Sequence, residues 1–208
     1  MTPEAAWPES SDGAVEAGLA RLLTDIRACR ECAADLPLGP RPVLRAAASA
    51  RVLIAGQAPG VRVHESGVPW DDPSGDRLRD WLGLDRDAFY DERKIAIVPQ
   101  GFCFPGTNPR GGDNPPRREC ARLWHGRLIP LLSRVELTLC VGQYAQAWHL
   151  GSRRKGTLTA TVAAWREYQP DVLPLPHPSW RNNVWLKRNP WFGAEVLPTL
   201  RAAIRRLL

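Results

Sequence analysis

Four short apolar runs lie along the chain, and stretches with a helical spacing of apolar residues separate them. Each run has the length of a strand that is buried on both faces. The predicted strands are Val52–Ala55, Ile95–Val98, Leu137–Val141 and Val172–Leu175. The predicted helices span residues 14–31, 76–83, 117–133, 143–149, 157–165 and 193–207. This alternation predicts an α/β protein with a parallel sheet that helices cover on both faces.

Three long stretches follow neither pattern and are rich in Pro, Gly, Asn or Arg. They span residues 33–50, 101–116 and 176–192, and the last two follow predicted strands. Loops of this length in a compact domain are more often functional than idle. We expect residues 1–13 to be flexible and residues 14–208 to form a single domain, because a chain of 208 residues suits one core.

The charge and aromatic content add a candidate partner. Lys and Arg number 28 and Asp and Glu number 22, which gives a net charge of +6. This excess is compatible with a polyanionic partner and equally with a protein that is merely basic. Several of the nine tryptophans lie in segments rich in Pro, Asn and Arg, where aromatic faces beside cations suit stacked bases. They are Trp70, Trp180, Trp185 and Trp191.

The amino-terminal sequence sets an expectation about the compartment. No apolar run approaches the length of a membrane span, and MTPEAAWPESSDG lacks the basic start and apolar centre of a signal peptide. We therefore expect a cytoplasmic protein with no membrane partner. Disulfides are rare in that compartment, so paired cysteines there indicate metal or redox chemistry.

The five cysteines are arranged as two pairs and one isolated residue. Cys29 and Cys32 form a CxxC, Cys103 and Cys120 bracket a Pro- and Gly-rich loop, and Cys140 lies inside an apolar strand. If the fold brings the two pairs together, four thiolates can hold a [4Fe-4S] cluster or a zinc ion. The alternative is that the cysteines are unligated and simply pack, which suits Cys140 in particular.

A Gly- and Pro-rich turn, GQAPG at residues 56–60, ends the first predicted strand. It offers backbone amides at the carboxyl end of a strand, where open α/β sheets bind ligands. The segment ESGVPWDDPSG follows shortly after, and HPSWRNN follows the last predicted strand. These three motifs are candidates for one binding site.

Taken in order, the motifs resemble those of the uracil-DNA glycosylase superfamily. The closest likeness is to its iron-sulfur branch, which has a Gly-Glu-Ala-Pro-Gly loop, a G-x-P-F segment, a late His-Pro-Ser and four cysteines spaced as Cys29, Cys32, Cys103 and Cys120 are here. The resemblance covers about residues 25–195. It implies a three-layer α/β/α sandwich around a short, mostly parallel four-stranded sheet, and a [4Fe-4S] cluster on the four cysteines, with zinc as the alternative.

The resemblance also implies a reaction, the hydrolysis of the bond between deoxyribose and a base flipped out of DNA. His177 takes the place of the catalytic histidine, and the loop with Gln57, Ala58, Pro59 and Gly60 lines the base pocket. Trp70 takes the place of the Phe that stacks on the base. A histidine near the departing base can stabilise its negative charge, and an aromatic face can hold its plane. The alternative for His177 is a structural role in a Pro-rich turn.

Three positions depart from the family pattern. Gln57 replaces the Glu of the iron-sulfur branch, and a Gln can orient a water but cannot take its proton. Ala58 stands where other branches have a water-positioning Asp or Asn. Pro99, with Gln100 beside it, stands where the family has the Asn that reads the pyrimidine edge, and we include Gln100 in the predicted base pocket. Candidates to supply the missing polar group, each of which is alternatively a solvated loop residue, are His64, Glu65, Asp71 and Asp72.

The segment after His177 mixes cations, Asn and Trp, which suits phosphate contacts and base stacking or wedging. Its alternative role is a Trp-rich helix cap packed on the sheet. The predicted DNA contacts are Pro178, Ser179, Arg181, Lys187 and Arg188.

These inferences lead to one expected function and two alternatives. We expect a monomeric DNA glycosylase of base-excision repair that releases uracil or another deaminated or damaged base from single- or double-stranded DNA. The first alternative is a weak or inactive lesion-binding protein that keeps the glycosylase fold, as the substitutions at Gln57, Ala58 and Pro99 suggest. The second is a hydrolase of small nucleosides, against which the basic, Trp-rich loop argues.

Overall fold

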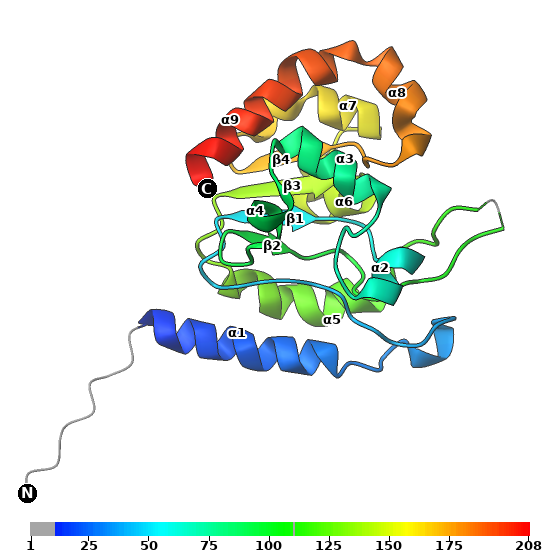
Figure 1. Cartoon of the computed structure of the whole chain (residues 1–208), viewed down its shortest axis with the longest axis vertical. Coiled ribbons are helices and arrows are strands. Elements are labelled where there is room, and N and C mark those ends of the chain that lie inside the picture. The colour runs from blue at the N-terminus through cyan, green and yellow to red at the C-terminus, as the bar shows by residue number, and fades with distance from the viewer. Residues whose placement is uncertain (1–10, 110) are drawn as a thin grey trace, which may run out of the picture.

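The computed structural model describes residues 11–109 and 111–208, and its centre is a four-stranded parallel sheet (Figure 1). The strands are β1 (Val52–Ala55), β2 (Ile95–Ile97), β3 (Leu137–Val141) and β4 (Val172–Leu175). Their order in the sheet is β2-β1-β3-β4, and every neighbouring pair is parallel. Nearly all strand residues are buried, which explains why the sequence shows continuous apolar runs rather than alternation.

Helices cover both faces of this sheet. On one face α3 (Pro73–Leu82), α4 (Arg86–Tyr90), α7 (Leu158–Ala163) and α9 (Leu197–Leu207) share a buried apolar cluster with the strands. On the other face α1 (Ser11–Arg27) and α5 (Arg118–Leu128) form a second cluster. In β1, Val52 and Ile54 belong to the first cluster and Leu53 to the second. Figure 1 shows the three layers, with α9 and α7 above the sheet and α5 and α1 below it. The predicted three-layer α/β/α sandwich is confirmed.

The remaining elements lie mostly near the carboxyl ends of the strands. The helices are α2 (Val61–Ser66), α6 (Gln143–Leu150) and α8 (Asn183–Arg188), and a π-helical turn at Phe192–Val196 leads into α9. Short 3-10 turns occur at Ala33–Asp35, Ile129–Leu131, Gly151–Arg153, Trp165–Tyr168 and Trp180–Asn182. Because all four strands are parallel, the loops that follow them gather at one edge of the sheet.

The predicted elements agree closely with the observed ones, with a few differences. The strand at Ile95 ends one residue early, and α1 runs over Ser11–Arg27 rather than 14–31. Residues 11–13 are therefore helical, and the rest of the predicted flexible segment lies outside the described residues. The helices α2, α4 and α8 were not predicted; α8 lies within a stretch, 176–192, that was expected to be irregular.

Within the described residues, no helix is both long and apolar enough to cross a membrane.

Candidate active site

A pocket of about 120 Å³ opens at the carboxyl ends of the strands. That volume is several times the roughly 10–15 Å³ that one water molecule needs. The loop after β1 lines it with Gly56, Gln57, Ala58 and Pro59. Residues from four other segments complete most of the lining: Trp70, Asp72, Pro99, Asp113, His177 and Ser179. The structure thus brings three of the predicted motifs, GQAPG, ESGVPWDDPSG and HPSW, into one cavity.

Trp70 forms a wall of this pocket and has an unusual backbone. Its φ of 58° lies in the left-handed region, which is rare for a bulky residue. Two glycines allow the tight packing around it. A Cβ at Gly75 would lie 1.8 Å from the carbonyl oxygen of Trp70, and a Cβ at Gly56 would lie 3.0 Å from its ring. The indole is therefore fixed against the end of β1.

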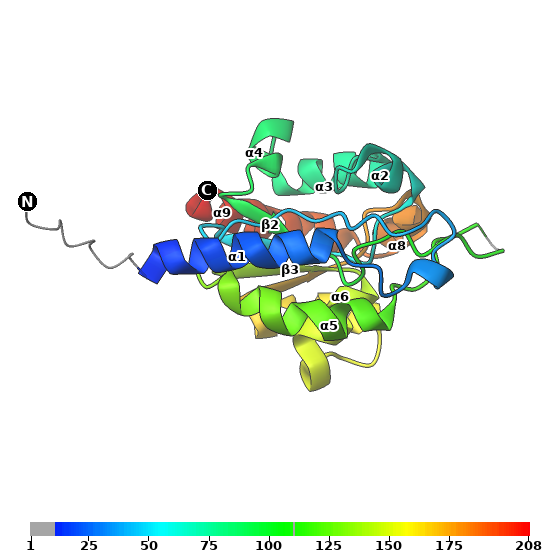
Figure 2. The same cartoon turned by 90° about the horizontal axis from the view of Figure 1, so that it is seen from below.

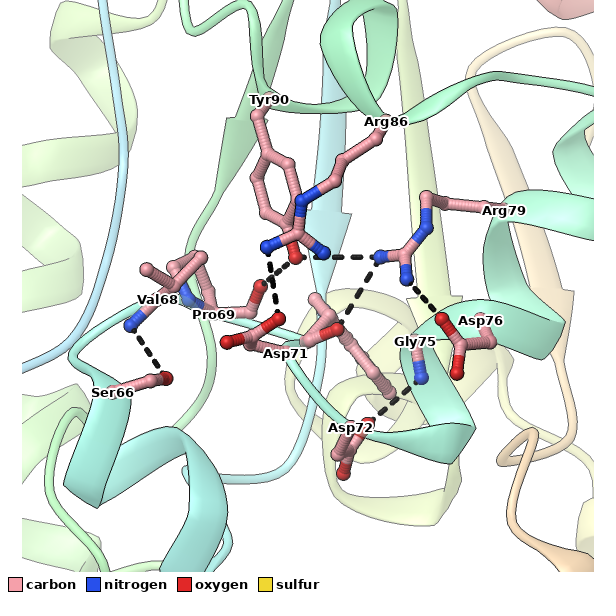
Figure 3. A network of polar contacts seen from close by, with 11 residues as sticks. Ser66, Val68, Pro69, Asp71, Asp72, Gly75, Asp76, Arg79, Arg86 and Tyr90 are labelled. Carbon is pink, nitrogen blue, oxygen red and sulfur yellow. Dashed lines mark hydrogen bonds and ion pairs between the residues drawn. The ribbon is translucent and has the colours of Figure 1, made fainter.

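A polar network holds the turn that carries Trp70 (Figure 3). The buried Arg79 donates to the Trp70 carbonyl oxygen at 3.4 Å and to the Tyr90 hydroxyl at 3.3 Å. Tyr90 in turn donates to the Pro69 carbonyl oxygen at 2.9 Å, and Arg86 pairs with Asp71 at 2.9 Å. The hydrogen bond from Arg86 lowers the pKa of Asp71. Arg79 and Tyr90 bind the backbone of this turn and Arg86 binds the Asp71 side chain, so these residues act as positioning residues for the pocket wall.

The His177 ring packs against the Trp70 ring in the lining of the pocket, with ring centroids 5.4 Å apart and an interplanar angle of 36°. Its backbone is fixed by Asn182, whose side chain donates to the His177 carbonyl oxygen at 2.7 Å. The Ser179 backbone N–H donates to His177 Nδ1 at 3.2 Å, so Nδ1 must carry a lone pair. Burial lowers the pKa of His177, although the charge of Asp72 opposes this. The ring is therefore neutral near pH 7, with its proton on Nε2.

Two carboxylates line the same pocket. Asp72 caps α3, accepting from the Gly75 backbone N–H at 2.8 Å. Asp113 lies in the loop between β2 and α5, and a Cβ at Gly60 would lie 3.4 Å from its Oδ2. Burial and the charge of Asp72 raise the pKa of Asp113, while Arg181 acts in the other direction. The pKa of Asp113 therefore lies above the usual range of an aspartate.

Of the four residues considered as substitutes for the missing carboxylate, only Asp72 lines the pocket. Asp71 is paired with Arg86, as described above. Glu65 has an exposed side chain, and His64 is buried with its ring 6.2 Å from that of Phe104. Asp113 was not predicted. It lies in the stretch 101–116, whose length marked it as functional, but nothing in the sequence singles out this residue.

The predicted base-pocket residues divide into two groups. Ala58, Pro59 and Trp70 line the pocket, as does Gln57, whose side-chain amide donates to the Asn114 carbonyl oxygen at 3.1 Å. That hydrogen bond ties the GQAPG loop to the stretch 101–116. Gly60 is not among the lining residues, although it lies beside one of them, Asp113. Gln100, by contrast, lines a different groove, and Pro99 takes its place in the pocket.

The predicted DNA-contact residues follow His177 at the mouth of the pocket. Pro178 is buried, and Ser179 lines the pocket and accepts from the Arg181 backbone N–H at 3.3 Å. The Arg181 side chain donates to the Gly111 carbonyl oxygen, so one of its hydrogen bonds is used inside the protein. The exposed Lys187 and Arg188 end α8.

Trp180 stands beside these cations with 69% of its surface exposed. The Arg181 guanidinium lies over its ring, 5.2 Å from the centroid. An exposed indole next to a pocket mouth is unusual for a monomer surface and suits insertion between bases.

The four cysteines of the predicted metal site line one small apolar pocket, together with Leu36, Phe102 and Trp124 among others. Cys29 and Cys32 follow α1, Cys103 follows β2, and Cys120 lies in the first turn of α5. The Phe102 backbone N–H donates to the Cys120 sulfur at 3.3 Å.

Burial raises the pKa of Cys103 to about 11 and that of Cys120 to about 12. In the described part of the chain, no group of three or more His, Cys, Asp or Glu side chains is placed closely enough to hold a metal ion as it stands. The four sulfurs nevertheless share a pocket, with an amide donor to one of them, and this is the donor set that a cluster requires. Cys140, by contrast, is fully buried and packs with Ala55 and Ala145, in keeping with the packing role considered for it.

The parallel sheet has a small pocket at its carboxyl edge, with an aromatic wall, a neutral histidine and carboxylates. These features define a class of α/β proteins that bind a planar group. A model of the uracil DNA glycosylase superfamily matches residues 44–201. The match covers most of the chain, so the chain belongs to this superfamily. At the family level it is a DNA-binding DNA glycosylase, a hydrolase of DNA repair. The match begins after Cys29 and Cys32, so it leaves the iron-sulfur branch unassigned.

Proposed function

We propose that the protein releases uracil or another deaminated base from DNA, with the base stacked on Trp70 and its developing negative charge stabilised by His177. The observation that supports this most directly is that these two rings lie side by side in the lining of one pocket, with the His177 proton on Nε2. A neutral N–H donor fixed in place stabilises charge as it forms on the base without reorganising first. Cleavage of the glycosidic bond leaves that charge on the base.

Asp113 is our candidate for the group that handles the attacking water. Gln57 cannot take a proton, and its amide nitrogen is already bonded to Asn114. Asp113 lines the same pocket beside Gly60 of the GQAPG loop, and its pKa is raised. A carboxylate there can also stabilise the positive charge that develops on the sugar. In this proposal it takes over the function of the carboxylate that the GQAPG loop lacks.

The function is tested with a panel of oligonucleotides bearing uracil, hypoxanthine, xanthine and oxidised pyrimidines, followed by alkali to reveal abasic sites. Wild type should release at least one deaminated base. Asp113→Asn should slow single-turnover release about 10²-fold, the lower end for a general base, because a dissociative reaction depends less on the base. Release equal to wild type would remove Asp113 from the mechanism. If wild type binds lesions but cleaves none of the panel, the lesion-binding alternative replaces the enzyme.

We further propose that Cys29, Cys32, Cys103 and Cys120 hold a [4Fe-4S] cluster with a structural role. When bound, such a cluster cross-links the segments that carry its ligands. Here those segments are the turn after α1, the loop after β2 and the start of α5. The loop after β2 also carries Asp113, so the cluster would stabilise the part of the base pocket that Asp113 lines.

The cluster proposal predicts a coloured protein. Purified without oxygen, wild type should be brown and contain iron and sulfide, because thiolate-ligated iron absorbs broadly in the visible range. Cys103→Ser should lose the colour, whereas the matched control Cys140→Ser should keep it. Colourless protein with stoichiometric zinc would replace iron by zinc in the same site. Protein without any metal would refute the four-thiolate site.

A further inference from the structure

A second groove, of about 460 Å³, lies between α5 and α6. Both helices begin near the carboxyl edge of the sheet, where the base pocket opens, and Figure 2 shows them on the same side of the molecule. The side chains that matter here are Gln100, Pro116, Arg118, Arg122, Tyr144 and Trp148, all of which line the groove. Its volume falls within the range of about 300–1,000 Å³ that is typical of small-ligand sites.

Gln100 is the polar group at the base of this groove. Only 4% of its surface is exposed, and its side-chain nitrogen has no hydrogen-bond partner among the described residues. Its backbone N–H donates to the Gly56 carbonyl oxygen at 3.0 Å, so its position is fixed by the end of β1. Buried side-chain amides normally have partners, and one left unpaired beside a groove indicates a ligand with hydrogen-bonding atoms.

Two cations form one side of the groove. Arg118 and Arg122 are four residues apart on α5 and therefore share a face of the helix. Both are exposed, and neither forms an ion pair with any described residue. The neighbouring Arg117, by contrast, is paired with Asp35 and Glu119 at 2.9 and 2.8 Å. The two unpaired guanidinium groups can therefore receive an anion from solution.

Two aromatic residues form the other side. Tyr144 and Trp148 are also four residues apart, on α6, and 45% of the Trp148 surface is exposed. The indole is held edge-on by the buried His125, with ring centroids 5.3 Å apart. His125 Nε2 is in turn 3.1 Å from the carbonyl oxygen of Pro99, a lining residue of the base pocket. Trp148 of the groove is therefore linked through His125 to Pro99 of the pocket.

The chemistry of this groove matches one nucleotide of a single strand. A flat exposed indole can stack on a base, a buried amide can bond to a base edge, and two arginines can hold the flanking phosphates. The groove also lies next to the pocket, since a Cβ at Gly101 would touch both Pro116, at 3.1 Å, and Ala58, at 3.5 Å. An acidic peptide could use the arginines and bond to the amide through a backbone carbonyl, but its carboxylates would not stack on the indole.

We propose that this groove binds a second, unpaired nucleotide of the strand whose damaged base occupies the pocket. This rests on the proposed function in so far as the ligand is DNA. The base of that nucleotide stacks on Trp148, its edge meets Gln100, and Arg118 and Arg122 bind its phosphates. A nucleotide paired in a duplex cannot place its base in the groove, so the site favours single-stranded DNA.

The test measures binding of a short, undamaged, labelled oligothymidylate and of the matching duplex by fluorescence anisotropy. Trp148→Ala should weaken single-strand binding about 5- to 150-fold, the decrease expected for one stacked base, with a smaller effect on duplex. Arg118→Ala with Arg122→Ala should lower the slope of log K against log salt by about 1.4, which is about 0.7 for each phosphate that is no longer neutralised. The matched control is Arg205→Ala with Arg206→Ala, which removes two exposed cations from the end of α9.

A second measurement does not depend on how well the variants fold. Wild type irradiated with an oligonucleotide containing 5-iodouracil should give a cross-link in the peptide that carries Tyr144 and Trp148. Three results would each overturn the proposal. The cross-links could lie only in other peptides, the groove and control variants could lose single-strand affinity equally, or wild type could fail to bind the single strand. The proposal would also fail if the groove variants bound an acidic aromatic peptide, used as competitor, more weakly than wild type does but bound the single strand equally well. If the groove variants bind the single strand more weakly as expected but wild type releases no base, the groove stands and the glycosylase proposal fails.

Discussion

His177→Ala is expected to slow single-turnover base release about 10²- to 10³-fold, with DNA binding almost unchanged. The decrease is that expected for removing one fixed hydrogen-bond donor to a developing negative charge. Hydrogen bonds from Ser179 to Nδ1 and from Asn182 to the carbonyl oxygen fix the orientation of His177. Rates at saturating enzyme report on the reaction itself, and anisotropy reports on binding.

The pH profile provides an independent check on the same residue. Burial lowers the pKa of His177, so the neutral ring persists as pH falls through about 6.5, where an ordinary histidine gains a proton. We therefore expect wild-type release to stay level through that region and to decrease only below it. His177→Asn, which keeps an N–H donor, should recover part of the rate that His177→Ala lacks. A histidine that served only as packing would give equal rates for the two variants.

Gly75→Ala is expected to have the second large effect, through the pocket wall. Its new Cβ would lie 1.8 Å from the Trp70 carbonyl oxygen, so α3 or the Trp70 turn must move. We expect a decrease of about 1–3 kcal/mol in the free energy of unfolding, as for other overpacked sites. Base release should fall about 10²-fold, because the displaced indole no longer stacks on the base. Chemical denaturation and single-turnover assays measure the two effects.

Gly126→Ala is the matched control, because Gly126 lies inside α5 with no heavy atom near its Cβ position. This change should leave release unaffected and stabilise the protein by up to about 1 kcal/mol, since Ala is the better helix former. The overlap at Gly75 is with backbone, so Trp70→Ala should not restore the stability of Gly75→Ala. If Gly75→Ala is as stable and active as wild type, the Trp70 turn is not fixed in the way described.

The strands were predictable because a parallel strand covered on both faces must be apolar throughout, and runs of apolar residues such as Val52–Ala55 are visible in a sequence. Short helices carry too few residues for a periodic pattern. Helix α4, for example, has five residues and depends on its cap, where Asp85 accepts from the Ala88 backbone N–H at 2.8 Å. Such local contacts stabilise a short helix although its sequence has no recognisable periodic pattern.

The site was predictable where residues follow strands and less so where they depend on long-range contacts. His177 and the GQAPG loop come directly after β4 and β1, so the parallel sheet brings them together. Asp113 reaches the pocket only through the folding of its long loop, which no local pattern encodes. Pro99 and Gln100 are neighbours after β2, and successive residues of an extended chain point to opposite sides, so only one of them can face the pocket.

The strand order β2-β1-β3-β4 also has an evolutionary consequence. The chain starts the sheet in the middle, at β1, and then adds strands on either side, so the connections that leave β1 and β3 run in opposite directions and open a crevice between them. Most pocket residues lie in the connection that leaves β1, with others after β2 and β4, and the cores on both faces of the sheet are built largely from other residues. Loop substitutions such as Gln57, Ala58 and Pro99 can therefore accumulate with little cost to folding. The architecture separates the selection of a substrate from the selection of a stable fold, and one scaffold can give rise to enzymes for different lesions.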